Sequence, residues 1–223
     1  MPLLTITDLQ KAYVSPEGSQ THIIDIPHFE MEEGSQIALR GTSGVGKTTF
    51  LNLIAGILGA DSGRIIIADE EMTALSESGR DRLRASHIGY IFQTFNLFAG
   101  YTALENVMLG MMFGKGIDAG FAQHLLERVG LGDRMGYRPS QLSVGQQQRV
   151  AVARAIANRP HLVLADEPTG NLDRHHANEA IALIREICGE NNAALLTVSH
   201  DEEILGQFEE ATDFAHVNRA WEG

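Results

Sequence analysis

Residues 41–48 read Gly-Thr-Ser-Gly-Val-Gly-Lys-Thr, a glycine-rich segment that requires a particular fold around it. Glycines let the main chain approach a phosphate and turn its N–H groups inward, and a following helix adds its positive end. The strand-like run Ile37–Leu39 precedes the segment, and the helix-like run Thr49–Leu58 follows it. Strand, loop and helix in this order predict a phosphate-binding loop in an α/β protein.

The loop predicts how a nucleoside triphosphate and its metal are held. The Lys47 ammonium supplies a positive charge for the β- and γ-phosphates, and the Thr48 hydroxyl is a candidate ligand for Mg²⁺. The residues of this segment that we expect to bind the nucleotide are Gly41, Thr42, Ser43, Gly44, Val45, Gly46, Lys47, Thr48 and Thr49. A chance glycine-rich turn would lack the correct flanking strand and helix.

The rest of the chain supports an α/β fold. Further strands are expected at Leu3–Leu9, His22–Phe29, Ile65–Ile67 and Ile88–Phe92. Residues 94–158 have helical spacing broken by glycines, which predicts a helical insertion. Nearly continuous apolar runs at His161–Ala165 and Ala193–Ser199 are typical of strands buried on both faces of a parallel sheet, and Ala177–Cys188 between them has a helical pattern.

Charge and composition exclude several classes of function. The formal net charge of −12 argues against a general nucleic-acid binder, which would normally present a basic face. No apolar run approaches the roughly 18 residues needed to cross a bilayer. The first residues also lack the pattern of a signal peptide. We therefore expect a cytosolic chain whose membrane role, if any, comes through a partner, with the lone Cys188 as a buried thiol.

Two acidic residues end the predicted strand Leu162–Ala165. Ligands of doubly wound sheets collect at the carboxyl ends of the strands. Asp166 is placed to hold Mg²⁺ through water, and Glu167 to take a proton from an attacking water. Acids at strand ends are often only solvated, but beside a phosphate loop we favour the catalytic interpretation.

Ser143 opens a Ser-x-x-Gln pattern before a predicted helix at Gln146–Ala157. One interpretation is a capping box and nothing more. The other is a second anion site, formed by the Ser143 hydroxyl, the Gly145 N–H and the positive end of the helix. The phosphate loop favours the anion site, although no ligand for it is evident in its own subunit.

These motifs together resemble the ATP-binding cassette (ABC) ATPases, and the resemblance extends from Tyr13 to His200. The matching motifs are the phosphate loop, the Q-loop (Gln93), the signature (Leu142–Arg149), the Walker B strand (Leu162–Glu167), the D-loop (Asn171-Leu172-Asp173), the switch histidine (His200) and an adenine-stacking aromatic residue (Tyr13).

The resemblance implies a P-loop NTPase fold over one domain, residues 1–223. Its nucleotide-binding core would comprise 1–93 and 159–223, with a mixed or parallel sheet and an N-terminal antiparallel β part. Residues 94–158 would be an inserted helical subdomain that carries the signature.

The family mechanism supplies further expectations. Two copies would dimerise head to tail, so that ATP on one phosphate loop meets Ser143, Val144, Gly145 and Gln146 of the other copy. Asp173 would act across this interface, His200 would contact the γ-phosphate, and Gln93 would sense the metal and water. The resemblance thus implies Glu167, His200, Gln93 and Lys47 as the catalytic residues, and Thr48, Gln93 and Asp166 as the Mg²⁺ site.

The segments Asp166–Asp173 and Ile91–Leu97 resemble the bacterial lipoprotein-release, macrolide-export and cell-division group in particular. This implies an ATPase subunit on the cytoplasmic face of the inner or plasma membrane, driving a permease that docks near Phe92–Phe98. An alternative is a regulator that transmits force to a cell-wall process without transport. A soluble ABC protein working on DNA or ribosomes is disfavoured, because there is one phosphate loop and no heptad tract.

Val144 departs from the family, whose signature usually has glycine at this position. A β-branched side chain is stiff and disfavours positive φ. We therefore expect an altered rate or nucleotide affinity, with the anion site of Ser143 and Gly145 retained.

Overall fold

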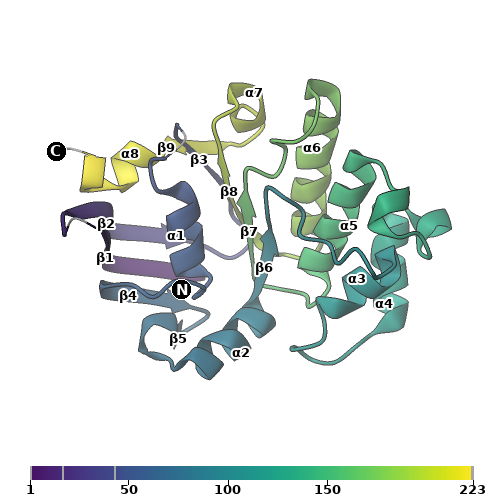
Figure 1. The fold of residues 1–223 in the computed structure, drawn as a ribbon, viewed down its shortest axis with the longest axis horizontal. Coiled ribbons are helices and arrows are strands. Elements are labelled where there is room, and N and C mark those ends of the chain that lie inside the picture. Colours follow the sequence, from purple (N-terminus) through teal and green to yellow (C-terminus); the bar gives the residue numbers. More distant parts are fainter. Residues whose placement is uncertain (1, 17, 43, 222–223) are drawn as a thin grey trace.

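A computed structural model describes residues 2–16, 18–42 and 44–221, which form two sheets with helices around them (Figure 1). The first sheet has four strands in the order β2-β1-β4-β5, and its strands pair antiparallel. Its strands are β1 (Leu4–Val14), β2 (Gln20–Met31), β4 (Ser62–Ile67) and β5 (Glu70–Glu71).

The second sheet has five strands in the order β6-β7-β8-β3-β9, and every pairing in it is parallel. Its strands are β3 (Gln36–Arg40), β6 (Ile88–Ile91), β7 (Leu162–Asp166), β8 (Ala194–Ser199) and β9 (Glu210–Asp213). Because the strands are parallel, their carboxyl ends share one edge, where β3, β7 and β8 deliver the residues that follow them.

Successive residues of the parallel strands point to opposite faces, and each face has its own hydrophobic core. On β7, Leu162 and Leu164 belong to the core shared with the antiparallel sheet, whereas Val163 and Ala165 belong to the core on the other side. This explains the unbroken apolar run at 162–165, since both faces of the strand are covered.

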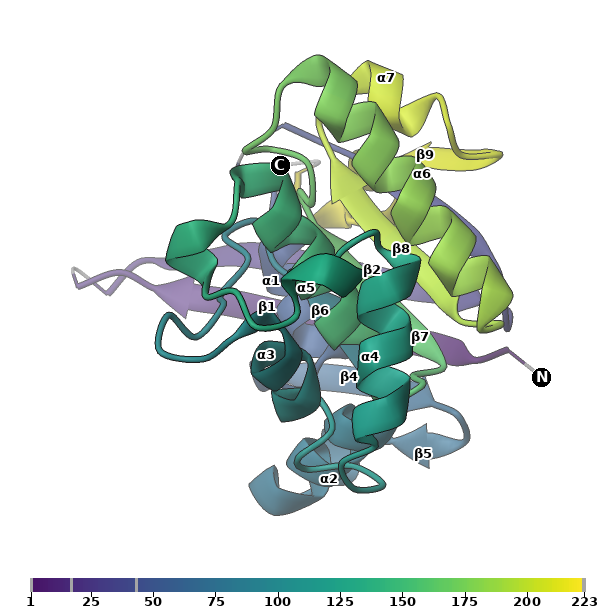
Figure 2. The same cartoon turned by 90° about the vertical axis from the view of Figure 1, so that its right-hand side faces the viewer.

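Helix α1 lies between the two sheets, and α3 to α6 gather on the opposite face of the parallel sheet (Figure 1). Helix α2 buries Leu83 in the same core as α1. Figure 2 shows α3, α4 and α5 in front of that face, with α6 beside them. The α-helices are α1 (Lys47–Ile54), α2 (Glu77–His87), α3 (Ala103–Leu109), α4 (Ala119–Arg128), α5 (Val144–Ile156), α6 (Arg174–Glu190), α7 (Glu202–Leu205) and α8 (Phe214–Val217). The 3-10 helices are η1 (Met72–Ala74), η2 (Gly132–Arg134), η3 (Pro139–Gln141) and η4 (Arg219–Trp221).

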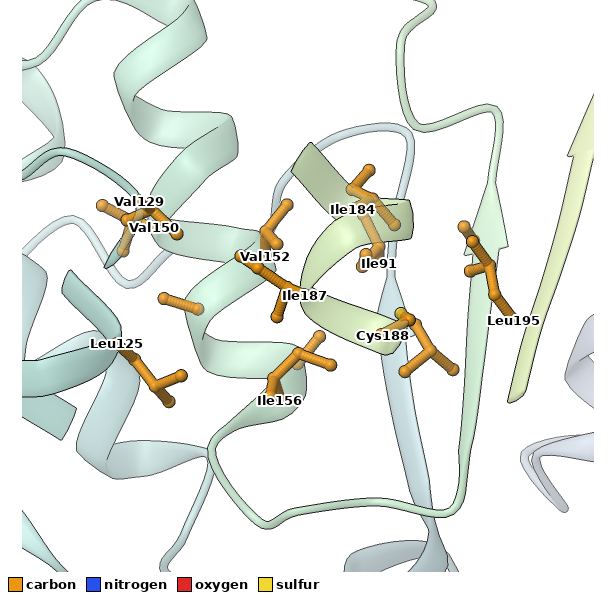
Figure 3. Close-up of a cluster of buried hydrophobic side chains, with 14 of the residues drawn as sticks. Ile91, Leu125, Val129, Val150, Val152, Ile156, Ile184, Ile187, Cys188 and Leu195 are labelled. Atoms are coloured by element: carbon orange, nitrogen blue, oxygen red, sulfur yellow. The ribbon is translucent and has the colours of Figure 1, made fainter. Parts of the chain in front are cut away.

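The core beneath α5 and α6 is built from branched aliphatic side chains (Figure 3). Val152 and Ile156 of α5 lie beside Ile184 and Ile187 of α6 (Figure 3). The predicted burial of Cys188 is confirmed, because its side chain is 1% exposed in this core. Burial raises the pKa of its thiol to about 12, so the side chain serves as an uncharged packing group.

The predicted α/β fold, with its antiparallel N-terminal sheet and parallel core sheet, is confirmed. The division into a core and a helical subdomain at 94–158 stays a prediction, and α3–α5 share their hydrophobic core with α6. Within the described part of the chain, no helix is long and apolar enough to span a bilayer.

Candidate functional site

The phosphate loop connects β3 to α1, and its curvature depends on glycine. Gly46 is the N-cap of α1 with φ of +95°, in the left-handed region that side chains disfavour. A Cβ on Gly46 would also lie 3.0 Å from both Cγ2 and the carbonyl oxygen of Ile23. Gly44 has φ of +89°, whereas Ser43, predicted to bind the nucleotide, lies outside the described residues. Strand β2 therefore presses against the loop where the phosphate-facing N–H groups begin.

Lys47 opens α1 and folds back over the loop. Its ammonium donates hydrogen bonds to the carbonyl oxygens of Gly41 and of Thr42, the latter at 3.0 Å. The same nitrogen lies 3.4 Å from Oε1 of Glu167, and the residue is 6% exposed. The positive charge is thus held in the concave side of the loop, next to a carboxylate that β7 supplies.

Asp166 ends β7 and faces the loop from the neighbouring part of the sheet. The Thr48 hydroxyl donates to its Oδ1 at 3.2 Å. Burial raises the pKa of Asp166, and the adjacent Glu167 carboxylate raises it further, while the Thr48 hydrogen bond opposes both effects. A divalent cation here would stabilise the ionised form of Asp166.

Glu167 has φ of +44°, a left-handed conformation that is uncommon for a residue with a side chain. Its N–H donates to the carbonyl oxygen of Val198 on the adjacent strand β8. Its Oε2 and Oε1 lie 2.9 and 3.0 Å from Nδ1 of His200, which follows β8. The main-chain turn thus aims the carboxylate into the space between the loop and His200.

A cavity of about 340 Å³ unites most of the predicted nucleotide and catalytic residues. Its lining comprises Tyr13, Ile23, Gly44, Gly46, Lys47, Thr48, Thr49, Gln93, Asp166, Glu167 and His200. Gly41, Thr42 and Val45 belong to the same loop but do not line the cavity. Sequence reasoning missed Ile23, because an apolar residue in a strand carries no signal for a ligand.

Two further lining residues come from β1 of the antiparallel sheet and from the segment after β6. Tyr13, near the end of β1, lines the cavity and is 47% exposed, so part of its side chain is open to a ligand. Gln93 follows β6, and a Cβ on Gly170 would lie 3.3 Å from its Nε2. The Gln93 side chain therefore lies against the loop that follows Glu167.

The signature residues lie apart from this cavity. Ser143 is the N-cap of α5: its hydroxyl accepts from the Gln146 N–H at 3.3 Å, and the Gln146 Oε1 accepts from the Ser143 N–H at 3.0 Å. The predicted capping box is thus present. A Cβ on Gly145 would meet no atom within 4 Å, so nothing within this subunit requires a glycine there.

Asp173 is also outside the cavity. It is the N-cap of α6 and accepts from the His176 N–H at 3.1 Å, with the His176 Nδ1 2.6 Å from its other oxygen. These hydrogen bonds lower the pKa of the Asp173 carboxyl. The side chain is thus ionised and oriented at the surface.

The predicted docking segment Phe92–Phe98 leaves β6 and remains partly open to solvent. Phe92 stacks on Tyr90 with 4.1 Å between the ring centroids, whereas Phe98 is 56% exposed and meets Tyr101 edge to face. The segment is therefore held at Phe92 by ring stacking and exposes the apolar side chain of Phe98 to solvent. Whether a permease binds here stays a prediction.

Val144 is the first residue of α5, outside the residues with positive φ, and its side chain is 49% exposed. The strain expected of a β-branched residue does not arise, because a helical conformation suits valine.

Val144→Gly is accordingly expected to lower the melting temperature slightly, since glycine is a few tenths of a kcal/mol less favourable than valine in a helix. The turnover number should rise or fall by no more than about threefold, because the Ser143 cap is untouched. Thermal denaturation and steady-state ATPase assays check both values, with Glu77→Gly, at the exposed first residue of α2, as the control. A tenfold change in turnover would show that the valine side chain itself meets the nucleotide or the partner.

The fold and the site define a P-loop nucleotide-binding protein with two strand-end carboxylates and a histidine at the loop. A family model described as ABC transporter matches residues 24–170. The chain belongs to this family, whose members bind and hydrolyse ATP.

Individual relatives agree over most of the chain. The lipoprotein-releasing system ATP-binding protein LolD of Pseudomonas syringae pv. tomato is 40% identical over 211 residues, which cover 93% of this chain and 92% of the relative. LolD of Xylella fastidiosa is 41% identical, covering 90% and 84%.

Solved structures of the ATP-binding cassette MJ0796 also match. A dimeric structure has a TM-score of 0.84 at 32% identity, covering 93% of this chain and 92% of that one. A dimeric post-hydrolysis structure bound to ADP and Pi has a TM-score of 0.81 at 32% identity, covering 90% and 89%.

Proposed function

We propose that this chain is the ATPase subunit of a membrane transporter of the lipoprotein-releasing type, acting as a head-to-tail homodimer. One observation carries the proposal: Glu167 lies within hydrogen-bonding distance of His200 and 3.4 Å from Lys47 at the mouth of the phosphate loop. A base, an orienting histidine and a phosphate-binding cation therefore converge on one cavity.

The donor set fits a hard divalent cation. The Thr48 hydroxyl and the Asp166 carboxylate already lie 3.2 Å apart, and the Gln93 amide lines the same cavity. Mg²⁺ prefers such oxygen donors together with phosphate oxygens and water. We assign these three residues to hold it; when bound, it would neutralise charge on the β- and γ-phosphates.

In this proposal Glu167 accepts a proton from the attacking water, and His200 orients the carboxylate through the Nδ1 contact. Lys47 would exchange its contact with Glu167 for phosphate oxygens when ATP enters, which frees the carboxylate for the water. The Tyr13 ring would stack on the adenine.

The dimer is supported by the position of the signature residues, which have no nucleotide site next to them in the described part of their own subunit. Ser143 and Gly145 are outside the cavity, and Gly145 has open space above it. The N-terminus of α5 is therefore available to an anion that this subunit does not itself bring there. The two MJ0796 structures are dimeric, which supports a dimer of this chain as well.

The membrane role rests on the relatives and on the docking segment. LolD proteins are named as parts of a lipoprotein-releasing system, and the matches cover 92% and 84% of the two relatives. We propose that the exposed Phe98 region receives a separate permease on the cytoplasmic face of the inner membrane.

Turnover per molecule is expected to rise steeply with protein concentration at saturating Mg-ATP, because a dimer of two incomplete sites is the active species. Dilution series of the ATPase assay, alongside light scattering with and without ATP, measure this. Lys47→Ala is the control and should bind little ATP at any concentration. A turnover number independent of concentration over about a hundredfold range, in a protein that stays monomeric, would contradict the shared site.

A further inference from the structure

The main chain from Gln93 to Phe98 is held by side chains of other elements. Arg154, on α5, donates from Nη1 to the carbonyl oxygen of Asn96 at 2.6 Å and from Nη2 to that of Phe95 at 2.7 Å. The guanidinium thus bridges two successive carbonyls. Its fixed fork of donors suits this geometry, which a lysine could not reproduce.

Arg154 binds carbonyl oxygens without a carboxylate to balance its charge. Within the described part of the chain, no carboxylate forms a salt bridge with it, and its guanidinium donates to the two carbonyl oxygens. Burial lowers the pKa of the guanidinium, which remains charged nonetheless. The partial desolvation of this half-buried charge is offset by hydrogen bonds to carbonyl oxygens and not by an ion pair.

The neighbouring helix makes room for this side chain. A Cβ on Gly110, at the end of α3, would lie 2.6 Å from the carbonyl oxygen of Arg154 and 3.1 Å from its Cγ. The accepting segment is also constrained, because Asn96 has φ of +50°. The contact between Arg154 and the carbonyl oxygen of Asn96 therefore depends both on the glycine beside Arg154 and on the backbone conformation of Asn96.

Two further side chains hold the ends of the segment. The Asn171 side chain, in the loop after β7, donates to the carbonyl oxygen of Gln93 at 2.6 Å. The buried Asn106, on α3, accepts from the Phe98 N–H at 2.8 Å and donates to its carbonyl oxygen at 3.2 Å. Because Gln93 and Phe98 are held in this way, a movement of α5 should act through Arg154 on the main chain between them.

We propose that Arg154 is a positioning residue that couples α5 to Gln93. Ser143 is the N-cap of the helix that carries Arg154, and the two residues lie about 16 Å apart along the helix axis at 1.5 Å per residue. When Ser143 engages the partner's nucleotide, Arg154 carries the displacement of α5 to the Gln93–Asn96 main chain and so sets the Gln93 side chain in the cavity. This inference rests on the proposed head-to-tail dimer.

The test is a double-mutant cycle on steady-state ATP hydrolysis. Arg154→Gln should lower kcat about tenfold with KM for ATP within about twofold, because Arg154 does not line the cavity. Arg154→Lys, which keeps the charge but not the fork, should lower kcat about threefold. In a Gln93→Ala background both losses should shrink to less than about twofold, because the residue through which Arg154 acts is gone.

Arg159→Gln is the matched control. Arg159 lies just after the end of α5, but its guanidinium stacks on Phe121 and pairs with Asp118. It should leave kcat within about twofold of the parent. Melting temperatures of all variants separate a loss of fold from a loss of coupling. If Arg154→Gln does not fold, Arg154→Lys carries the cycle alone.

An equal fold-loss of kcat in the parent and in the Gln93→Ala background would overturn the positioning role and leave the proposed ATPase intact. A parent protein without ATP hydrolysis would instead overturn the proposed function and this role with it. The two failures are therefore distinguishable.

Discussion

Glu167→Gln is expected to lower the turnover number for ATP by about a thousandfold, within the range that a general base contributes. The amide keeps the shape of the side chain but cannot accept the proton of the water. It also removes the negative charge 3.4 Å from the Lys47 ammonium, so ATP should bind at least as tightly as it does to the parent. Because hydrolysis is blocked, the ATP-bound dimer should accumulate. Single-turnover hydrolysis, nucleotide titration and light scattering measure the three effects.

Glu186→Gln, on the exposed face of α6 where Glu186 pairs with Arg128, is the matched control and should retain full turnover. Residual activity above about a tenth of the parent's in Glu167→Gln would exclude Glu167 as the base. In that case the His200 contact would be a structural tie only.

Ser143→Arg is expected to reduce turnover more than about a hundredfold while changing the ATP affinity of the monomer by less than about twofold. Ser143 does not line the cavity, so the monomer has no contact to lose. A long cation at the N-terminus of α5 opposes the helix dipole and fills the space that the partner's phosphates would occupy. Equilibrium binding at low protein concentration and turnover at high concentration separate the two quantities.

The substitution also removes a helix cap, which by itself costs about 1 kcal/mol of stability. Ser76→Arg provides the matched control, because Ser76 caps α2 by accepting from the Gly79 N–H at 3.3 Å and lies away from the nucleotide cavity. It should lower the melting temperature to a similar extent and leave turnover unchanged. Equal losses of turnover in both variants would mean that Ser143 is a cap and nothing more.

Local chemistry made much of the site predictable. The phosphate loop, the acids at the end of β7 and the capping box of Ser143 are each defined by residues adjacent in the chain, and each lies where its pattern indicated. Buried strands were equally clear, because a strand covered on both faces is apolar at every position.

Elements without a strong periodic signal were not predicted. Helix α2 buries only Leu83 along its length, so its sequence has almost no apolar stripe to detect. Strand β9 is four residues long, and its partly polar run Glu210–Asp213 exists as a strand because β3 provides an edge to pair with. Such elements depend on their neighbours more than on their own propensity.

The amino-acid sequence by itself determined the class of this protein, since an ordered series of short motifs identifies the ABC family without any coordinates. Only the tertiary structure decided which groups meet: that Lys47, Glu167 and His200 share one cavity, that Val144 needs no unusual backbone, and that Arg154 reaches the main chain after Gln93. The physical reason is that the residues of a motif are adjacent in the chain, so the sequence already determines their spacing. A hydrogen bond between residues 33 or 58 positions apart instead depends on how sheets and helices pack.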